Sequence, residues 1–340
     1  MTSNRFLFNF AASYSGGGFK RLYAYAKWFN HNGGAGFIIH PQCSSLINEF
    51  PNNRFTVVGQ SRFQRLLNDC DYLDEIRKTI GVPDVYYSYG IPVYTKFGRI
   101  NWFHLSNVLP LGPWSVPLSL FDKVKLSYLG KRIKSNLENV DIISAESDFS
   151  LSLIHSKYAK KFFLSVNGSD DEILFQKSQH TQKQDNIAVV VGTYRYKAIE
   201  DSYRVFERLR ENNPKLKLVV IGDEKKVPKH LHINQNITMT GRLQRDDVIS
   251  YLRNSQYYIS TTRIENSYNA ASEGIFFANE SFISDIGPHR ELLVGMPFER
   301  ISIPNMDRQV LHVKRQDIST LHLKNWDTVI TEMIKRVSET

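Results

Sequence analysis

Short apolar segments alternate along most of the chain with longer segments whose apolar residues recur every three or four positions. Short runs rich in β-branched and aromatic residues are typical of buried strands, and the longer periodic segments are typical of helices. In the first half the pattern predicts strands at residues 5–10, 35–39, 55–58, 84–87, 99–104, 141–144 and 162–166. This alternation predicts an α/β fold with parallel sheets covered by helices on both faces.

The second half follows a polar stretch at residues 176–186 that is typical of a linker. Five further strands are predicted at residues 187–192, 216–223, 236–241, 256–262 and 281–285. The length of 340 residues suits two domains that each bury their own core. We therefore expect an N-terminal domain at 1–175, a C-terminal domain at 186–323 and a final amphipathic helix within 324–340.

Two glutamates, Glu265 and Glu273, lie eight residues apart just after the predicted strand at 256–262. The apolar spacing after Glu265 predicts a helix, with Glu273 about two turns along it. In open α/β sheets, ligands bind outside the carboxyl ends of the strands, near helix N-termini. A carboxylate there accepts hydrogen bonds from sugar hydroxyls, and Glu273 suits the two vicinal hydroxyls of a ribose. Three backbone N–H groups at the predicted helix start favour oxygen-rich ligands, those of Asn266, Ser267 and Tyr268.

This E-x7-E pair resembles the mark of the family 4 retaining glycosyltransferases, which have the two-Rossmann-domain GT-B architecture. The strand, glycine, helix and strand order of residues 236–260 is similar to that family, and so is the segment 281–293, where Glu291 stands at the family's late glutamate. The chain departs from the family at 278–280, where Ala-Asn-Glu replaces G-x-P. The resemblance implies two domains facing each other across a cleft, with the last helix packed back on the N-terminal domain.

Lys197, at the start of the first helix of the C-terminal half, matches a lysine of the family. A cation there stabilises the charge that develops on a departing nucleotide diphosphate. The family often has an arginine just after the strand glycine, where this chain has Thr193, and Arg195 is the candidate to replace it. An ordinary exposed cation is the alternative interpretation of either residue.

Gly16, Gly17 and Gly18 follow the first predicted strand and precede a helix at 20–30. Such glycines let the backbone approach a phosphate closely, although a tight strand–helix turn also requires glycine. No G-x-G-x-x-G fingerprint is present. The resemblance implies that this triplet faces the donor diphosphate.

His104 ends the strand at 99–104, where the family commonly has a histidine facing the donor sugar. A neutral imidazole there can hydrogen-bond a sugar hydroxyl. The alternative is a histidine packed among its aromatic neighbours. The resemblance therefore implies catalytic roles for Glu265, His104 and Lys197.

Asp69 and Asp71 spell D-x-D, the metal-binding mark of the other large glycosyltransferase architecture. They fall in a predicted helix with no flanking buried strand, which favours a solvated helix face. We therefore expect no metal and no other cofactor, with the nucleotide-sugar acting as co-substrate.

The net charge of +9 indicates anionic partners. Five basic residues lie in the predicted helix at 121–134, namely Lys123, Lys125, Lys131, Arg132 and Lys134. They do not form one clean face opposite an apolar stripe, so a membrane-surface helix and a solvated basic helix remain equally open. Nucleic acid is disfavoured because no binding motif accompanies the charge. The absence of a long apolar run or a convincing signal peptide predicts a cytoplasmic protein, with the inner face of the plasma membrane left open.

The resemblance implies a retaining transfer of one sugar from a nucleotide-diphosphate donor to a hydroxyl of a saccharide acceptor, either free or lipid-linked. The basic surface suggests the assembly of a bacterial surface polysaccharide on a lipid carrier. Two alternatives stay open: a nucleotide-sugar epimerase or hydrolase on the same fold, and a non-catalytic protein that binds an anionic glycan or membrane.

Overall fold

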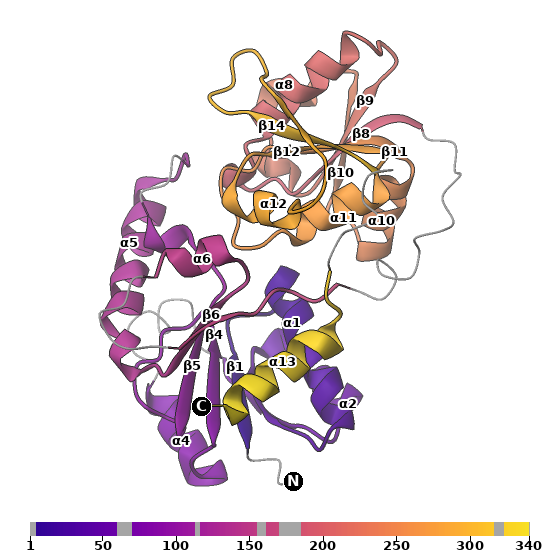
Figure 1. Cartoon of the computed structure of the whole chain (residues 1–340). Coiled ribbons are helices and arrows are strands. Elements are labelled where there is room, and N and C mark those ends of the chain that lie inside the picture. The colour runs from indigo at the N-terminus through magenta and orange to yellow at the C-terminus, as the bar shows by residue number, and fades with distance from the viewer. Residues whose placement is uncertain are drawn as a thin grey trace. The chain divides into compact units, whose positions relative to one another are not determined.

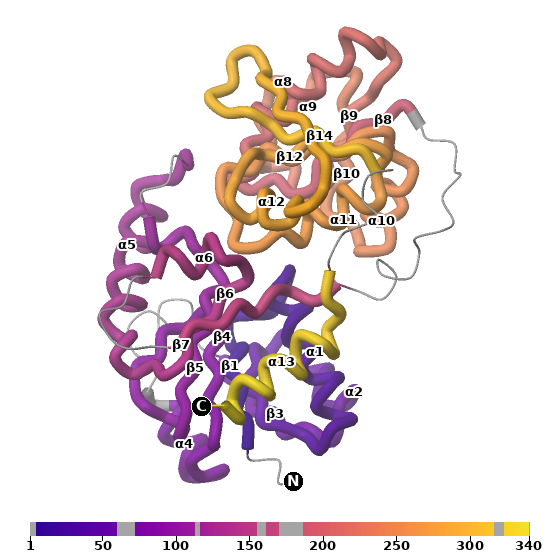
Figure 2. The backbone as a smooth tube through the Cα atoms, viewed as in Figure 1, coloured from indigo at the N-terminus to yellow at the C-terminus, as the bar shows by residue number. Residues whose placement is uncertain are grey.

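The computed structural model describes residues 5–59, 70–112, 116–154, 161–169, 185–315 and 323–339. The chain divides into two compact units, shown in Figures 1 and 2. Unit 1 contains residues 1–112, 120–169 and 324–340, and unit 2 contains residues 113–119 and 170–323. We describe each unit by itself.

Unit 1 is built on a seven-stranded parallel sheet with the strand order β3-β2-β1-β4-β5-β6-β7. The strands are β1 Phe6–Phe10, β2 Gly36–Ile39, β3 Arg54–Val57, β4 Val85–Tyr89, β5 Ile100–Leu105, β6 Ile142–Ala145 and β7 Lys161–Leu164. All residues of β1, β2, β4 and β6 are buried, as expected for central strands that are covered on both faces. The order reverses at β1, and the loops at the carboxyl ends of β1 and β4 therefore meet there.

The longer helices of unit 1 are α1 Gly16–His31, α4 Cys70–Ile80, α5 Leu120–Ser135 and α13 Trp326–Ser338, with short helices at α2 Leu46–Glu49 and α6 Asp148–Ser152. Helix α13, the last element of the chain, packs beside α1 (Figure 2). Its residues Ile330, Met333 and Val337 belong to the same apolar cluster as Phe8 and Phe10 of β1. The final helix thus completes the core formed by the first strand.

The segment that leaves unit 1 after Ser169 lies beside the segment that returns to it at Lys324. The backbone N–H of Ser169 donates to the carbonyl of Lys324 at 2.8 Å, and Ser169 forms a parallel β-bridge with Asn325. A Cβ on Gly168 would meet the ring of Trp326 at 2.5 Å, so only glycine allows this close approach. The outgoing and returning segments are therefore held side by side.

Arg21 of α1 fastens the outgoing segment. Its guanidinium is fully buried and donates hydrogen bonds to the Asn167 side chain and to the backbone carbonyls of Ser165 and Val166. It also lies 5.5 Å from the centre of the Trp326 ring. A buried cation is tolerated only when its donors are satisfied, and these partners meet that demand.

Unit 2 is also built on a seven-stranded sheet, with the order β10-β9-β8-β11-β12-β14-β13. Its strands are β8 Asp185–Val191, β9 Lys217–Ile221, β10 Ile237–Gly241, β11 Ser255–Ser260, β12 Glu280–Ser284, β13 Glu299–Ile301 and β14 Val310–Lys314. Its helices are α8 Ile199–Arg210, α9 Lys229–His232, α10 Arg245–Arg253, α11 Asn269–Phe277 and α12 Gly287–Leu292. The strands from β8 to β12 are parallel, whereas β14 runs antiparallel to both β12 and β13.

The α/β fold with two parallel-sheet domains is confirmed, with two differences in detail. The antiparallel edge formed by β13 and β14 was not predicted. Helix α11 begins at Asn269 and not directly after Asn266, so Glu273 lies about one turn into the helix rather than two. No helix among the described residues is long and apolar enough to span a bilayer.

Candidate functional site

The carboxyl edge of the unit 2 sheet brings Lys197 and Glu265 together. Lys197 follows β8 and Glu265 follows β11, and these two strands are neighbours in the sheet. Lys197 Nζ lies 2.5 Å from Glu265 Oε1, with 12% and 21% of the two side chains exposed. Two residues predicted separately from the sequence therefore form one ion pair at the edge where α/β proteins bind ligands.

The backbone around Lys197 is shaped for this contact. Gly192 directly follows β8 and has a φ of +90°, and the side chain of Lys197 passes 3.4 Å from where a Cβ on Gly192 would lie. Ala198 adopts the left-handed conformation with a φ of 48°, between a short 3-10 turn at Arg195–Lys197 and helix α8. Left-handed alanine is uncommon and costs free energy. This strain lies one residue from the proposed ligand-binding cation.

The ion pair sets the protonation of the groups around it. Burial opposes the charge of Lys197, but Glu265 and the nearby phenols of Tyr258 and Tyr196 hold the pKa of the ammonium above its ordinary value. Burial, reinforced by Glu265, raises the pKa of Tyr196 to about 12. Lys197 is therefore a permanent cation here and Tyr196 a neutral hydroxyl.

Glu273 is held by a different cation. Arg245, the first residue of α10, donates from Nη1 to Glu273 Oε1 at 3.2 Å. The next residue, Gly274, is required by packing, because a Cβ there would meet the ring of Tyr258 at 2.0 Å. Glu265, Glu273 and Lys197 all act electrostatically on the buried Tyr258 hydroxyl, so the three charges share one neighbourhood. Neither Arg245 nor Tyr258 was singled out from the sequence.

The loop between Glu265 and α11 differs from the expectation. Asn266, Ser267 and Tyr268 precede the helix instead of forming its first turn, and Tyr268 is the residue just before the helix. Their N–H groups thus belong to a loop at the sheet edge, which removes the predicted helix-start geometry. The order of the elements is unchanged, and a role in donor binding stays a prediction.

Thr193 and Arg195 have different environments. Thr193 is buried, and its hydroxyl donates to the carbonyl of Asp223 at 3.0 Å, which joins the loops after β8 and β9. Arg195 is exposed at the same edge. Thr193 therefore supports the loop, and Arg195 is the accessible cation of this segment.

His289 of α12 also belongs to this neighbourhood, although the sequence did not single it out. The ring is buried, and its Nδ1 lies 2.9 Å from the Ser284 carbonyl oxygen. Burial lowers the pKa of His289 to about 4 against the opposing field of Glu265. The imidazole is neutral, and the nearby carbonyl indicates that Nδ1 carries the proton.

In unit 1, the glycine triplet forms the first turn of α1. The helix begins at Gly16, four residues earlier than predicted, with Gly16 at a φ of +65°. A Cβ on Gly18 would lie 3.1 Å from the ring of Tyr89 and 3.0 Å from Ser13 Oγ. The triplet thus provides a left-handed turn and a close approach between α1 and β4, while phosphate binding by it stays a prediction.

The His104 ring is fully buried, as in the alternative of a histidine packed among aromatic neighbours, and its role toward the donor sugar stays a prediction. It is stacked on Tyr89 at 5.0 Å between centroids and 12° between planes. His104 Nδ1 lies 2.7 Å from Ser144 Oγ, and Nε2 lies 3.6 Å from Glu146 Oε1. Burial lowers the pKa of His104 to about 4, so the imidazole is neutral as expected.

Glu146 is a buried carboxylate behind Tyr89. The Tyr89 hydroxyl donates to Glu146 Oε1 at 2.8 Å. Burial opposes the charge of this carboxylate, yet its contacts with His104 and the field of Arg21 lower the pKa of Glu146 to about 2. The ionised Glu146 carboxylate and the neutral His104 imidazole hold Tyr89 in place, the first through the hydrogen bond to its hydroxyl and the second by stacking on its ring. No sequence pattern marks Glu146 as a buried carboxylate, because it stands among polar residues directly after β6.

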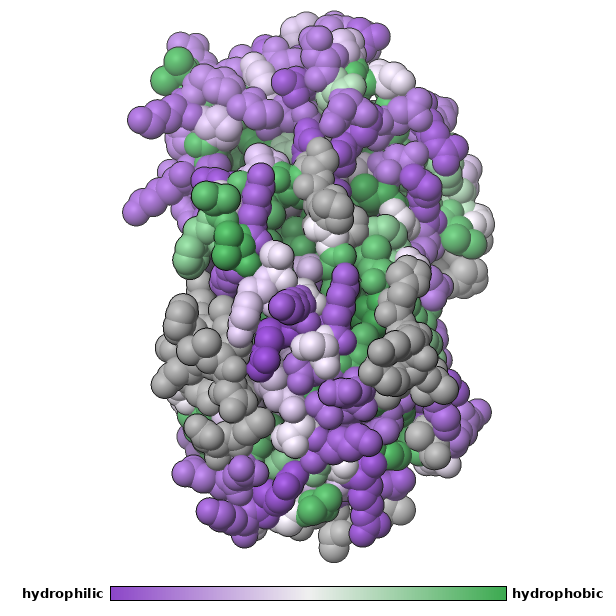
Figure 3. Space-filling model, turned by 90° about the vertical axis from the view of Figure 1, so that its left-hand side faces the viewer, coloured by the Kyte–Doolittle hydropathy of each residue, from purple (hydrophilic) through white to green (hydrophobic). Residues whose placement is uncertain are grey.

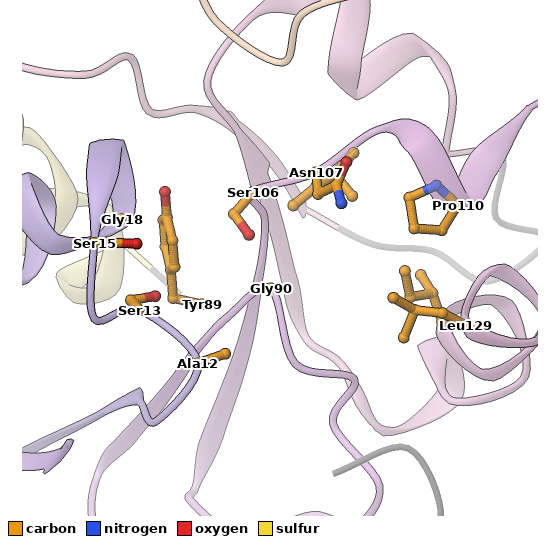
Figure 4. Close-up of a pocket in the computed structure, with 12 residues that line it drawn as sticks. Ala12, Ser13, Ser15, Gly18, Tyr89, Gly90, Ser106, Asn107, Pro110 and Leu129 are labelled. Atoms are coloured by element: carbon orange, nitrogen blue, oxygen red, sulfur yellow. The ribbon is translucent and has the colours of Figure 1, made fainter. Parts of the chain in front are cut away.

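Tyr89 borders a cavity of about 290 Å³ that lies wholly within unit 1 (Figure 4). The cavity is lined by the loops after β1, β4 and β5 and by α5. It therefore lies at the carboxyl edge of the unit 1 sheet, beside the point where the strand order reverses.

No group of three or more His, Cys, Asp or Glu side chains suited to a metal ion occurs among the residues that the structure describes. Asp69 lies outside the described residues, and the Asp71 side chain is not described although α4 includes its backbone. The expectation of metal independence thus stays a prediction.

Residues 171–274 match the sequence model of the glycosyl transferases group 1. This segment contains Lys197, Glu265 and Glu273. No curated protein sequence matches the chain.

Several solved structures are similar to the whole chain. Sucrose-phosphate synthase from Thermosynechococcus elongatus is 10% identical with a TM-score of 0.66, and the match covers 98% of each chain. Anabaena HepE in complex with UDP and glucose is 12% identical with a TM-score of 0.64, over 99% of this chain and 100% of that one. The E. coli trehalose-6-phosphate protein bound with UDP-2-fluoro glucose is 11% identical with a TM-score of 0.58, over 85% and 86%. The chain has the two-domain GT-B fold, and its second unit carries the sequence features of the group 1 glycosyl transferases.

Proposed function

We propose that the protein is a glycosyltransferase that moves one sugar from a nucleotide-diphosphate donor to a hydroxyl of a saccharide acceptor. The observation that carries this proposal is the Lys197–Glu265 ion pair, with Glu273 beside it, in a segment that matches the group 1 model. Two of the similar structures hold UDP or a UDP-sugar analogue, so UDP is the first nucleotide to test.

The two members of the ion pair suit opposite parts of such a donor. The ammonium of Lys197 would bind the diphosphate and stabilise the charge that grows on it as the glycosidic bond breaks. The carboxylate of Glu265 would accept hydrogen bonds from the sugar and stabilise positive charge on the ring. Glu273 would hold the ribose hydroxyls, with Arg245 fixing its orientation.

We further propose retention at the anomeric carbon, without a protein nucleophile and without a metal. This follows from the E-x7-E resemblance. A donor phosphate oxygen would take the acceptor proton, and positioning together with fixed charges would supply most of the rate. The two glutamates would then act as hydrogen-bond acceptors for the donor, not as nucleophile and acid.

Product analysis with a UDP-sugar tests the proposal. A glycosyltransferase forms a glycoside and UDP only when a saccharide acceptor is present. An epimerase or a hydrolase consumes the donor without an acceptor, and that result would contradict transfer. A protein that binds anions only through its charge would lose nucleotide-sugar binding at high salt, because salt screens exposed charges.

A membrane-bound acceptor is the second part of the proposal, and helix α5 supports it. Large apolar side chains on α5 are 40–79% exposed and follow the spacing i, i+1, i+4 and i+8, which places them on one face: Leu120, Phe121, Val124 and Tyr128. We call them the α5 stripe. On a helix of 3.6 residues per turn, Lys123 and Lys125 lie on either side of this stripe, and Lys131 follows it one turn after Tyr128.

Figure 3 faces the side of the molecule where α5 lies, and apolar surface there adjoins hydrophilic surface. An apolar stripe flanked by lysines suits an anionic bilayer, since apolar burial and attraction to lipid headgroups add together. We propose that α5 holds the protein at an anionic membrane, in keeping with surface polysaccharide assembly on a lipid carrier at the cytoplasmic face.

Vesicle sedimentation tests this contact. The protein should sediment with phosphatidylglycerol vesicles and stay in solution with phosphatidylcholine vesicles. The doubly substituted variant Phe121→Glu, Val124→Glu should stay in solution with both. Ile233→Glu, which changes an 84% exposed residue of unit 2, should behave as wild type. Equal sedimentation of wild type and the α5 variant would contradict the proposal.

A further inference from the structure

The cavity of unit 1 has a hydroxyl-rich side and an apolar side, which we call its polar bank and its apolar bank (Figure 4). Ser13 and Ser15, from the loop after β1, lie on one side with Tyr89, and Ser106 directly follows β5. The opposite side is formed by Pro110 and by Leu129 of α5. Pockets of this kind bind the apolar part of a ligand on one side and fix its orientation through a few polar groups.

Several polar side chains of the polar bank can still form hydrogen bonds with a ligand. Among the described residues, the hydroxyls of Ser13, Ser15 and Ser106 make no hydrogen bond, and the Asn107 side-chain N–H groups have no acceptor. The Tyr89 hydroxyl is already engaged, since it donates to Glu146. Tyr89 thus contributes its ring, while the serines and Asn107 contribute donors and acceptors.

No charge borders the cavity within the described part of the chain. None of the twelve lining residues is Asp, Glu, Lys, Arg or His. A phosphate or carboxylate in this cavity would have no cation as partner, and an ionised group that loses water without one is strongly disfavoured. The N-terminal turn of α1 offers positive potential only at the edge formed by Ser15 and Gly18.

The volume of the cavity suits a ligand about the size of one sugar ring. At ~30 Å³ for each water molecule in the liquid, about 290 Å³ holds about ten waters. That is close to the number of non-hydrogen atoms in one hexose. A sugar ring has C–H groups on its two faces and hydroxyls at its rim, so it matches one apolar bank and one polar bank.

We propose that this cavity is the acceptor subsite and that it accepts one uncharged sugar ring in preference to a sugar phosphate or a uronic acid. The inference rests on the proposed glycosyl transfer and adds the chemical class of the acceptor. Ser106 and Asn107 bind ring hydroxyls, and Leu129 packs on a C–H face of the ring.

Saturation-transfer NMR tests the inference without any turnover. The probes are the methyl glycosides of glucose, galactose and rhamnose, with glucose 6-phosphate and glucuronate as charged counterparts. At least one neutral glycoside should bind, and at least about tenfold more tightly than both charged sugars. Equal or tighter binding of a charged sugar, or no binding of any neutral glycoside, would overturn it.

Substitutions inside and outside the cavity test whether the neutral glycoside binds there. Leu129→Glu places a carboxylate in the apolar bank and should weaken binding of the neutral glycoside at least about tenfold. Ile47→Glu makes a similar change on α2, outside the cavity, and should leave the affinity unchanged. Ser106→Ala, which adds no charge, should weaken binding about three- to tenfold through the loss of one hydrogen bond. Unchanged affinity in folded Leu129→Glu and Ser106→Ala would place the sugar elsewhere and overturn the assignment.

A UDP titration of the same samples separates this inference from the proposed function. Sugar binding without any nucleotide-diphosphate binding would contradict glycosyl transfer and leave the cavity as a neutral-sugar site. Nucleotide binding together with a preference for charged sugars would contradict the inference alone.

Discussion

Lys197 Nζ and Glu265 Oε1 lie 2.5 Å apart at the carboxyl edge of the unit 2 sheet. In the protein without ligand, each charge is the partner of the other, so neither is left largely buried and unpaired. A nucleotide-sugar that binds here would offer phosphate oxygens to the lysine and hydroxyls to the glutamate. Donor binding would therefore break the Lys197–Glu265 ion pair. The affinity for the donor would depend on how well its phosphate oxygens and hydroxyls replace the two lost contacts.

Glu265→Gln should lower the turnover rate by roughly 100- to 1000-fold, the range for a group that stabilises charge in the transition state. The change keeps the size of the side chain and one acceptor but removes the negative charge. Affinity for the nucleotide without its sugar should stay nearly unchanged. Steady-state kinetics and calorimetry measure the two quantities. Normal turnover with poor nucleotide binding would exchange the roles of the two glutamates.

Glu273→Ala should weaken the binding of the bare nucleotide diphosphate by roughly 1.5–3 kcal/mol, the usual contribution of a charged hydrogen-bonded contact. Arg245 would lose its partner, so thermal unfolding must show that the variant is folded. Glu299→Ala is the matched control, because the Glu299 side chain is 71% exposed on β13. Unchanged nucleotide affinity in a folded Glu273→Ala protein would remove Glu273 from the ribose site.

Activity should persist in excess EDTA, because we assign the neutralisation of the diphosphate to Lys197 and Arg195. The measurement is the initial rate before and after chelation, followed by addition of Mg²⁺ or Mn²⁺. A loss of activity that either ion restores would show that Asp69 and Asp71, or another site, hold a metal.

The stability of unit 1 should fall as the pH drops from 7.5 to 5, because of His104. Burial lowers the pKa of His104 from 6.5 to about 4, so the unfolded chain takes up this proton first. The stability that neutral His104 supports is complete above pH 6.5 and is lost progressively toward pH 4. At pH 5 the loss is about 2 kcal/mol.

Urea unfolding followed by tryptophan fluorescence reports this loss, since Trp28, Trp102 and Trp326 all belong to unit 1. The pH dependence should shrink in His104→Gln, whatever the absolute stability of that variant. His289→Asn lies in unit 2 and should leave the dependence of unit 1 unchanged. An equal pH dependence in wild type and His104→Gln would mean that His104 is not the titrating group.

The strands that the sequence predicts well are those with continuous apolar runs. Central strands such as β1 and β8 are predicted within two residues of their ends, because burial on both faces demands apolar residues throughout. Strand β14 was missed since His312 interrupts its apolar pattern and charged residues follow it. Its pairing with β12 connects residues about thirty positions apart, which a local pattern does not reveal.

In the candidate site, too, a local sequence pattern does not reveal contacts between residues that are distant in the chain. Glu265 and Lys197 stand out individually, but their pairing depends on β8 and β11 being neighbours. Glu146 follows β6, and the order β4-β5-β6 is what brings it to His104 and Tyr89. A buried carboxylate of this kind has no sequence signal, because its low pKa comes from residues that are distant in the chain.

The packing of α13 on α1 fixes the order in which the protein is completed during synthesis. Ile330, Met333 and Val337 fill the core of unit 1, yet they are made after all of unit 2. Until α13 has left the ribosome, the aromatic cluster around Phe8 and Phe10 lacks the side chains that cover it on one side and is open to aggregation. The first unit to be translated is thus the last to close, and a premature stop after residue 323 leaves a finished second unit tethered to an unfinished first one.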